Sequence, residues 1–201
     1  MDKKSYALGM SIAHNLMGSG VKGLDYKDFA KGVEDIMSGN KPEISIEEAG
    51  SLLEKMFKEI EREQKAENEA IGAAFKKEGE DFLKENAGKE GVVVLPSGLQ
   101  YKVIVKGNGK APKATSRVKC HYEGRFTDGS IFDSSYRRGE PAVFGLNQVI
   151  PGWTEGLQLM TEGSKYELYI PYHLAYGDTG SRGAIPPCAA LVFTVELLEV
   201  L

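Results

Sequence analysis

The chain has 201 residues, of which 41% are hydrophobic and 27% are charged, a composition typical of a soluble globular protein with one large domain or two small ones. Its net charge of −4 argues against nucleic acid or an anionic membrane surface as the main partner, because phosphate contacts need a basic face. No run of residues approaches the ~18–20 apolar positions that a membrane span needs, so none is predicted.

The first residues do not have the pattern of a secretory signal. Gly9, Ser11 and His14 interrupt the stretch in which a signal peptide would carry its apolar core. We therefore expect a cytoplasmic protein. A chain numbered after removal of its signal would instead be periplasmic or attached to the cell surface.

Two short helices are predicted in the first 40 residues. Their apolar stripes recur every third or fourth position and consist of Leu8, Ile12 and Leu16 in the first helix and Phe29, Val33 and Ile36 in the second. Glycine-containing stops follow at 18–20 and 38–40. Neither helix is long enough to be stable alone in water, so both must bury their stripes against something.

A third, much longer helix is predicted over residues 45–86. It begins with the capping-box pattern Ser45-Ile46-Glu47-Glu48, and an apolar stripe follows as far as Ile60. Residues 58–69 are nearly all charged helix formers, and apolar residues resume at Ala70. At 1.5 Å per residue, a continuous helix would be roughly 60 Å long. We expect a solvated middle section that joins two packed regions.

Residues 1–60 are predicted to pair two copies of the chain. Two short helices and one end of a third supply only a thin core for about 60 residues, so a partner chain is the economical source of more buried surface. The alternative is a self-contained bundle of these helices that packs on the other domain. The predicted domains are a helical dimerisation arm with its linker helix at 1–88 and a second domain at 89–201.

After Gly88 the apolar pattern changes from a helical period to strict alternation. Strands are predicted at 99–105, 118–122, 166–170 and 191–197. A hairpin turn is predicted at 128–129, and one short helix that begins with proline is predicted at 151–160. The predicted fold class is therefore α+β, in which an all-α arm precedes an antiparallel sheet wrapped around a short helix.

The cysteines and histidines indicate neither a metal site nor a nucleophile. Cys120 and Cys188 are too few for a disulfide framework, and no Cys/His spacing fits a metal site. Cys120 alternates with Val118, which makes it a small buried strand residue. His121 would point to the opposite face, so a Cys/His pair has poor geometry. The sequence predicts no metal site and no cofactor.

The second domain carries many aromatic residues close to predicted loops. They are Tyr122, Phe132, Phe144, Trp153, Tyr176 and Phe193. Any one of them alone would be read as a core residue. Together with Asp133 and Arg138 they predict an apolar pocket that holds a few polar groups.

Several motifs of this domain resemble those of the FK506-binding-protein family of prolyl isomerases. They are VKCHYEG at 118–124, DGSIFDSS at 128–135, QVIPGW at 148–153, AYG at 175–177 and IPPCAALVFTVEL at 185–197. The resemblance covers residues 98–201. The helical arm is similar to the dimerisation region of the Mip-like bacterial branch, including its long connecting helix. The resemblance implies a five-stranded antiparallel sheet wrapped around one short helix.

The resemblance also implies a role for each pocket residue. Trp153 would form the floor, and the substrate-binding walls and rim would be Tyr122, Phe132, Asp133, Arg138, Phe144, Val149, Ile150, Tyr176, Ile185 and Phe193. Arg138 would be the partner of Asp133. The Tyr176 hydroxyl and the Ile185 backbone N–H would orient carbonyls of the substrate. Phe132, Asp133 and Tyr176 would be catalytic, with Asp133 in an electrostatic role.

The function implied is peptidyl-prolyl cis/trans isomerisation during protein folding, without a cofactor. The expected partners are proline-containing polypeptides, unfolded proteins, a second copy of the chain and inhibitors that resemble FK506 or rapamycin. A competing hypothesis is a chaperone clamp whose pocket binds chains without important turnover. A purely structural dimer is a third reading, but it leaves the pocket unexplained.

Overall fold

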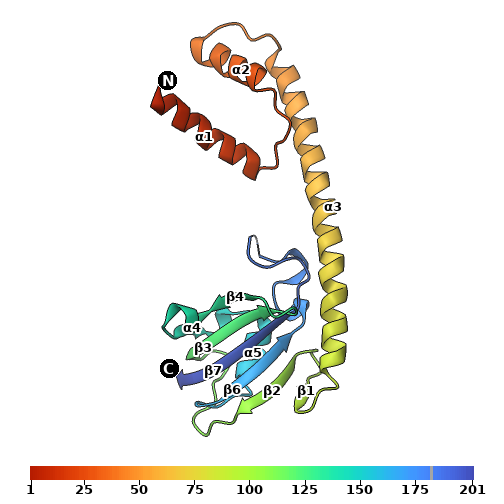
Figure 1. Cartoon of the computed structure of the whole chain (residues 1–201), viewed down its shortest axis with the longest axis vertical. Coiled ribbons are helices and arrows are strands. Elements are labelled where there is room, and N and C mark those ends of the chain that lie inside the picture. Colours follow the sequence, from red (N-terminus) through yellow and green to blue (C-terminus); the bar gives the residue numbers. More distant parts are fainter. Residues whose placement is uncertain (182) are drawn as a thin grey trace. The chain divides into compact units, whose positions relative to one another are not determined.

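The computed structural model describes residues 1–181 and 183–201, and it divides into two compact units, Met1–Glu67 and Asn68–Leu201. Helices make up the first unit, whereas the second contains an antiparallel sheet, which confirms the predicted α+β fold class (Figure 1). The units meet inside one helix, at a point that precedes the predicted division after residue 88.

The first unit contains helices α1 (Lys3–Gly18) and α2 (Tyr26–Ser38) and the beginning of α3 (Ile46–Asn86). The second and third helices begin where the sequence predicts. The Asp25 carboxylate accepts the Lys27 N–H at 2.8 Å, and the Ser45 hydroxyl accepts the Glu48 N–H at 3.1 Å. Both contacts satisfy backbone donors that a helix start leaves without partners.

The apolar stripes of the first unit stay exposed. Only Val21 and Asp35 are buried among residues 1–67. The large apolar side chains that remain exposed include Leu8, Met10, Met17, Phe29, Val33, Ile36, Met37, Leu52, Leu53 and Phe57. This unit therefore does not bury its stripes within itself, as a self-contained bundle would. Residues 61–70 of α3 are exposed throughout, as expected for the charged section.

The part of α3 that belongs to the second unit packs closely on that unit through two buried glycines. Gly72 and Gly79 are seven residues apart, which is about two helical turns, so they share one face. A Cβ atom on Gly72 would lie 3.2 Å from the Pro187 Cβ, and one on Gly79 would lie 2.8 Å from the Ala190 Cβ. Glycine at these positions lets the helix backbone lie directly against the segment that precedes the last strand.

The end of α3 is tied to the sheet by buried amides. Asn86 is 1% exposed, and its Nδ2 donates to the Gln100 Oε1 at 3.0 Å. The Gln100 Nε2 in turn donates to the Leu83 carbonyl at 2.8 Å. Because a buried amide that lacks partners is costly, this network fixes where the helix ends relative to the sheet.

In the part of the chain that the structure describes, the sheet has seven strands. They are β1 (Val92–Val94), β2 (Gln100–Val105), β3 (Arg117–Phe126), β4 (Ile131–Ser134), β5 (Ala142–Gly145), β6 (Lys165–Ile170) and β7 (Leu191–Val200). Their order is β1-β2-β6-β7-β3-β4, with β5 also paired to β3, and all pairs are antiparallel. The predicted strands are confirmed.

The expected sheet of five strands differs from the observed one for two reasons. β7 pairs with one edge of β3 over residues 118–126. On the other edge, β5 pairs with residues 117–120 and β4 with residues 123–125, so two short strands share one position in the sheet. β1 adds a further short strand outside β2. The chain between β4 and β5 forms helix α4 (Ser135–Arg138).

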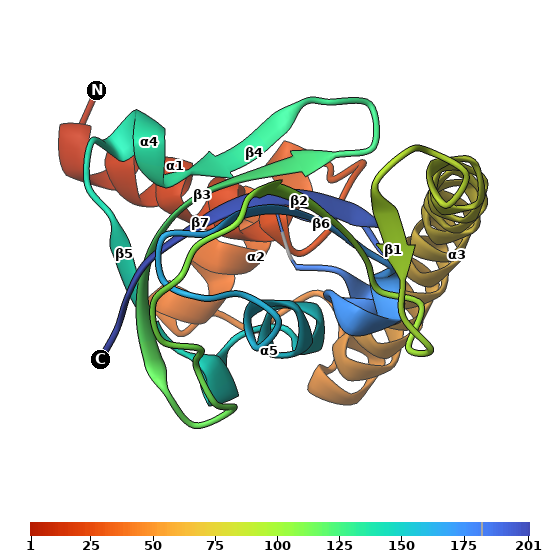
Figure 2. The same cartoon turned by 90° about the horizontal axis from the view of Figure 1, so that it is seen from below.

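Helix α5 (Pro151–Leu157) lies against the sheet, which curves over it (Figure 2). It ends earlier than the predicted residue 160, because a tight turn follows in which the Met160 N–H donates to the Leu157 carbonyl at 3.1 Å. A Cβ atom on Gly156 would lie 2.8 Å from the Leu168 Cδ1, so a glycine permits this close packing on β6. The described residues of the unit also form short 3-10 helices at Leu146–Gln148, Tyr172–Leu174 and Gly177–Thr179.

Candidate active site

A cavity of about 500 Å³ opens at the start of α5. Its lining residues are Tyr122, Phe132, Asp133, Phe144, Gln148, Val149, Ile150, Trp153, Tyr176 and Phe193. The structure thus brings together all the predicted site residues except Arg138 and Ile185. Sequence reasoning missed Gln148, although the residue lies inside the quoted QVIPGW motif.

Trp153 forms the floor of the cavity. Pro151 opens α5, and the backbone N–H of Trp153 donates to the Ile150 carbonyl at 2.9 Å. Trp153 therefore lies in the first helical turn. The side chain is only 4% exposed. The rings of Tyr122, Phe144 and Phe193 meet it edge-on at centroid distances of 5.3, 5.4 and 5.3 Å. Such perpendicular contacts fix the indole in one orientation.

Two phenylalanine rings form one wall, and a glycine lets them do so. Phe132 and Phe193 lie 5.6 Å apart and nearly perpendicular. A Cβ atom on Gly124 of β3 would lie 2.6 Å from the Phe132 Cζ and 2.7 Å from the Phe193 Cε1. Sequence reasoning missed Gly124, although a glycine inside an alternating strand is a signal for close approach by another group.

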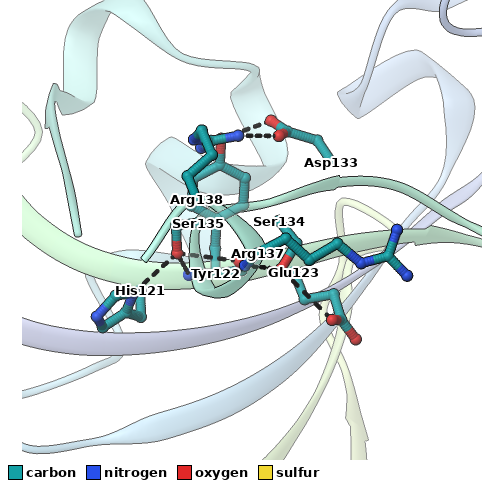
Figure 3. Close-up of polar contacts among 8 residues, drawn as sticks. All are labelled: His121, Tyr122, Glu123, Asp133, Ser134, Ser135, Arg137 and Arg138. Atoms are coloured by element: carbon teal, nitrogen blue, oxygen red, sulfur yellow. Dashed lines mark hydrogen bonds and ion pairs between the residues drawn. The ribbon is translucent and has the colours of Figure 1, made fainter. Parts of the chain in front are cut away.

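A polar network forms the rim beside this wall (Figure 3). The Tyr122 hydroxyl donates to the Asp133 Oδ2 at 2.5 Å. The Arg138 guanidinium donates to the Asp133 Oδ1 through Nη1 and to the Tyr122 hydroxyl at 2.8 Å through Nη2. Arg138 does not line the cavity, but it holds two residues that do. The network places one positive and one negative charge beside the aromatic wall of the cavity.

The network moves the pKa values of Asp133 and Tyr122 away from neutral pH in opposite directions. Burial by itself raises the pKa of Asp133, but the hydrogen bonds from Tyr122 and Arg138 and the charge of Arg138 outweigh it, so the pKa lies below its usual 3.8. Burial, followed by the hydrogen bond to Asp133, raises the pKa of Tyr122 above its usual 10.0. At neutral pH the site therefore holds a carboxylate and a neutral phenol.

We expect the variant Arg138→Ala to raise the pKa of Asp133, because it removes a hydrogen bond and a positive charge that both favour the carboxylate. A depressed pKa stabilises the fold above the unfolded value of about 3.9, and this contribution is lost as pH falls through the folded pKa. In the variant the folded pKa should lie closer to the unfolded value, so this stabilising contribution should be smaller and its loss should be complete at a higher pH. NMR titration of the Asp133 carboxyl carbon measures the change, with Arg137→Ala as the control. An unchanged pKa in Arg138→Ala would contradict this account.

Ile185 belongs to the same buried cluster as Trp153 and Phe193 but does not line the cavity. It is outside the cavity lining, it is 7% exposed, and its backbone N–H already donates to the Ser181 carbonyl at 2.9 Å. The predicted contact between this N–H and a substrate carbonyl would require that bond to open. Tyr176, in contrast, lines the cavity and is 40% exposed, so its side chain is accessible at the rim.

The thiol and imidazole of β3 lie apart, as the strand alternation predicts. Cys120 is fully buried, and burial raises the pKa of its thiol to about 12, so it remains protonated. The His121 ring stacks on Tyr136 at 4.6 Å, and its Nδ1 lies 2.9 Å from the Ser135 hydroxyl. This arrangement confirms a packing role for Cys120 and gives it no base.

Two family descriptions match the chain. The family described as FKBP-type peptidyl-prolyl cis-trans isomerase matches residues 108–198. The family described as the domain amino terminal to FKBP-type peptidyl-prolyl isomerase matches residues 1–103. The two matched regions therefore cover all of the first unit and most of the second.

Individual relatives match along nearly the whole chain. The FKBP-type 22 kDa peptidyl-prolyl cis-trans isomerase of Escherichia coli is 44% identical over 98% of this chain and 94% of its own. The outer membrane protein MIP of Legionella longbeachae is 40% identical over 99% of this chain and 85% of its own. The crystal structure of FkpA from Escherichia coli superposes with a TM-score of 0.72 at 38% identity, over 98% of this chain and 95% of the other.

The expected cytoplasmic location is wrong. A protein with 40% identity along 99% of this chain is named an outer membrane protein, which agrees with the alternative of a periplasmic or surface-attached protein. A signal peptide is removed from a mature chain, so the composition of the folded units does not record the compartment. Among the helices of residues 1–181 and 183–201, none is both long enough and apolar enough to cross a membrane.

Proposed function

The chain belongs to the FKBP-type peptidyl-prolyl cis-trans isomerase family and catalyses rotation about Xaa-Pro bonds, and we propose that the cavity above Trp153 is the site of this reaction. The observation that supports the site is the aromatic enclosure itself. Three rings meet the indole edge-on beside a cavity of about 500 Å³, a volume within the range of small-molecule sites and large enough for a proline ring with its flanking peptide groups. A protease-coupled assay with an Xaa-Pro tetrapeptide tests the assignment, because variants of the lining residues should lose turnover.

The proposed mechanism uses the low polarity of this enclosure. Rotation about a peptide bond faces a barrier of ~18–20 kcal/mol, because the planar form carries the resonance. Twisting the amide reduces its dipole, so an apolar surrounding favours the twisted form over the planar one. Trp153, Phe193 and the pair Val149 and Ile150 would hold the proline ring. No bond is broken, and the proposal requires no cofactor.

Phe132, Asp133 and Tyr176 are the proposed catalytic residues. Phe132 excludes water from one wall of the cavity. The role of Asp133 is electrostatic rather than that of a base, because its lowered pKa makes the carboxylate a poor proton acceptor at neutral pH. The exposed Tyr176 side chain would orient a carbonyl next to the proline. Inhibitors that resemble FK506 or rapamycin would occupy the same cavity.

We further propose that residues 1–60 pair two copies of the chain. The support is the row of exposed apolar side chains on α1, α2 and the start of α3, in a unit that buries only Val21 and Asp35. We keep the proposal that residues 1–88 form the dimerisation arm with its linker helix and residues 89–201 the isomerase domain. Residues 68–88 should nevertheless fold together with the isomerase domain, because Gly72 and Gly79 pack on it.

Sedimentation velocity should show that the full chain is a dimer at micromolar concentration. Phe29→Glu should shift it to monomer, because burying an unpaired carboxylate in an apolar interface costs several kcal/mol. Leu198→Glu is the matched control: Leu198 is 38% exposed and Phe29 is 40% exposed, but Leu198 lies on β7 in the other unit. A monomeric full chain, or equal dissociation by both variants, would refute pairing through the arm.

Pairing would also suit a chaperone role. A dimer with two cavities gains effective concentration for a long unfolded chain without a change in the chemical step. The clamp hypothesis predicts binding of unfolded proteins with little turnover, whereas the aromatic enclosure favours an enzyme that also holds its clients. Turnover of a short peptide distinguishes the two.

A further inference from the structure

We propose that Ser135 is a positioning residue for catalysis, which fixes Tyr122 in the cavity wall from behind. The inference rests on the proposed function of the cavity, because Ser135 does not itself line it. Its side chain is instead fully buried at the start of α4, next to the backbone of β3 (Figure 3).

The backbone of Tyr122 has no strand beside it on one edge. β5 stops pairing with β3 at Cys120, and β4 begins pairing at Glu123. In the described part of the chain neither strand pairs with position 122. A buried N–H and a buried C=O must both find partners, because an unpaired group costs as much as a lost hydrogen bond.

The Ser135 hydroxyl replaces the missing strand. The Tyr122 N–H donates to the Ser135 Oγ at 2.8 Å, and the same Oγ donates to the Tyr122 carbonyl at 3.1 Å. One hydroxyl thus satisfies both backbone groups of a single residue. The serine is 13 residues away in sequence, so the contact also anchors α4 to β3.

His121 completes the arrangement. A hydroxyl has one proton, and here it is used toward the Tyr122 carbonyl, so the oxygen must accept from other partners. Its neighbour at 2.9 Å is the His121 Nδ1, which must then carry a proton and donate to it. The His121 ring is held in place by stacking on Tyr136. All three groups are satisfied when His121 has its proton on Nδ1.

The side chain of Tyr122 links this tether to the cavity. Its ring lies 5.3 Å from Trp153, and its hydroxyl donates to Asp133. Loss of the Ser135 hydroxyl would leave two backbone groups unpaired and would let β3 shift at this point. The Tyr122 ring, and the Asp133 carboxylate that accepts its hydrogen bond, would then move relative to Trp153 at the floor of the cavity.

Ser164 provides a matched control for the test. It is also fully buried, and its hydroxyl also tethers backbone, because it accepts from the Gly107 N–H at 3.0 Å and from the Thr161 N–H at 3.1 Å. None of these residues lines the cavity. Ser135→Ala and Ser164→Ala should therefore lower the melting temperature by similar amounts but differ at the site.

In the full-length protein, Ser135→Ala should lower kcat/KM for an Xaa-Pro tetrapeptide by about tenfold, and Ser164→Ala by less than twofold. The emission of Trp153, the single tryptophan, should shift in the first variant only. Ser135→Thr keeps the hydroxyl and should recover most of the turnover. Equal losses in the two alanine variants, or no loss in Ser135→Ala, would overturn the proposal.

Two further measurements keep the result interpretable. If Ser135→Ala fails to fold, amide exchange of the Tyr122 N–H in the native protein decides: slow exchange supports the tether, and exchange as fast as an open strand edge overturns it. Phe132→Ala separates the two hypotheses. If both Ser135→Ala and Phe132→Ala keep full turnover, the assignment of the cavity fails. If Phe132→Ala loses turnover and Ser135→Ala keeps it, only the role of Ser135 fails.

Discussion

Replacing Phe132 by alanine should lower kcat/KM for an Xaa-Pro tetrapeptide by about thirtyfold, while the protein stays folded. The ring is half-buried and contacts Phe193 at 5.6 Å and Phe126 at 5.0 Å, so its removal opens the cavity wall to water. Loss of apolar contact worth about 2 kcal/mol in the transition state corresponds to this factor. Water would also solvate the planar amide, which reduces the preference for the twisted form.

The protease-coupled assay measures this loss, and the control is Phe57→Ala. Phe57 lies on α3 in the first unit and is 47% exposed, so its removal changes neither cavity nor wall. Circular dichroism should be the same for both variants. Full turnover in Phe132→Ala would mean that the reaction takes place elsewhere.

Removal of residues 1–67 should leave tetrapeptide turnover within about twofold but slow the catalysed refolding of a proline-limited protein by at least tenfold. Every cavity residue lies between Tyr122 and Phe193, so a short peptide does not need the arm. An unfolded protein is longer and can engage both cavities of one dimer, and in linked systems the resulting avidity can exceed the affinity of a single site by about 10²–10⁴.

The fragment for this experiment should begin at Asn68 rather than at residue 90. Gly72 and Gly79 pack on the isomerase, and Asn86 is hydrogen-bonded to Gln100, so a later start would remove part of the unit. The full chain with Phe132→Ala is the control and should lose both activities. If the fragment lost peptide turnover, the arm would have to contribute to the site itself.

The three helices of residues 1–86, helix α5 and strands β2, β3, β6 and β7 could be predicted from the sequence because their apolar periods are regular, whereas the short strands β1, β4 and β5 were not predicted. Ser45 and Asn86 mark the ends of the long helix, and the change to alternation after Gly88 marks the sheet. The split of one sheet position between β4 and β5 was not predictable from these periods. It depends on where α4 interrupts the edge, which only the pairing along β3 shows.

The cavity residues could be named from the family motifs, but their supports could not. Ser135 is one letter in the DGSIFDSS motif, and its role requires knowing that Tyr122 lacks a strand neighbour. From the sequence alone, Gly72 is a residue that destabilises a helix; only the structure shows that it lets the helix pack against Pro187. For Ile185, the motif does not show that the backbone N–H predicted to orient a substrate carbonyl already donates to the Ser181 carbonyl.

The central position of β7 has a consequence for how the protein is made. β7 lies between β6 and β3, and within the described residues it is the one strand that joins the two sides of the sheet. While a ribosome is still adding residues 191–200, those sides have no common neighbour, and Phe193 is absent from the cavity. Since such distant pairings form slowly, the enzyme becomes active only after residues 191–200 have left the ribosome. The arm, in contrast, is complete early and can meet a second nascent chain while the catalytic unit is unfinished.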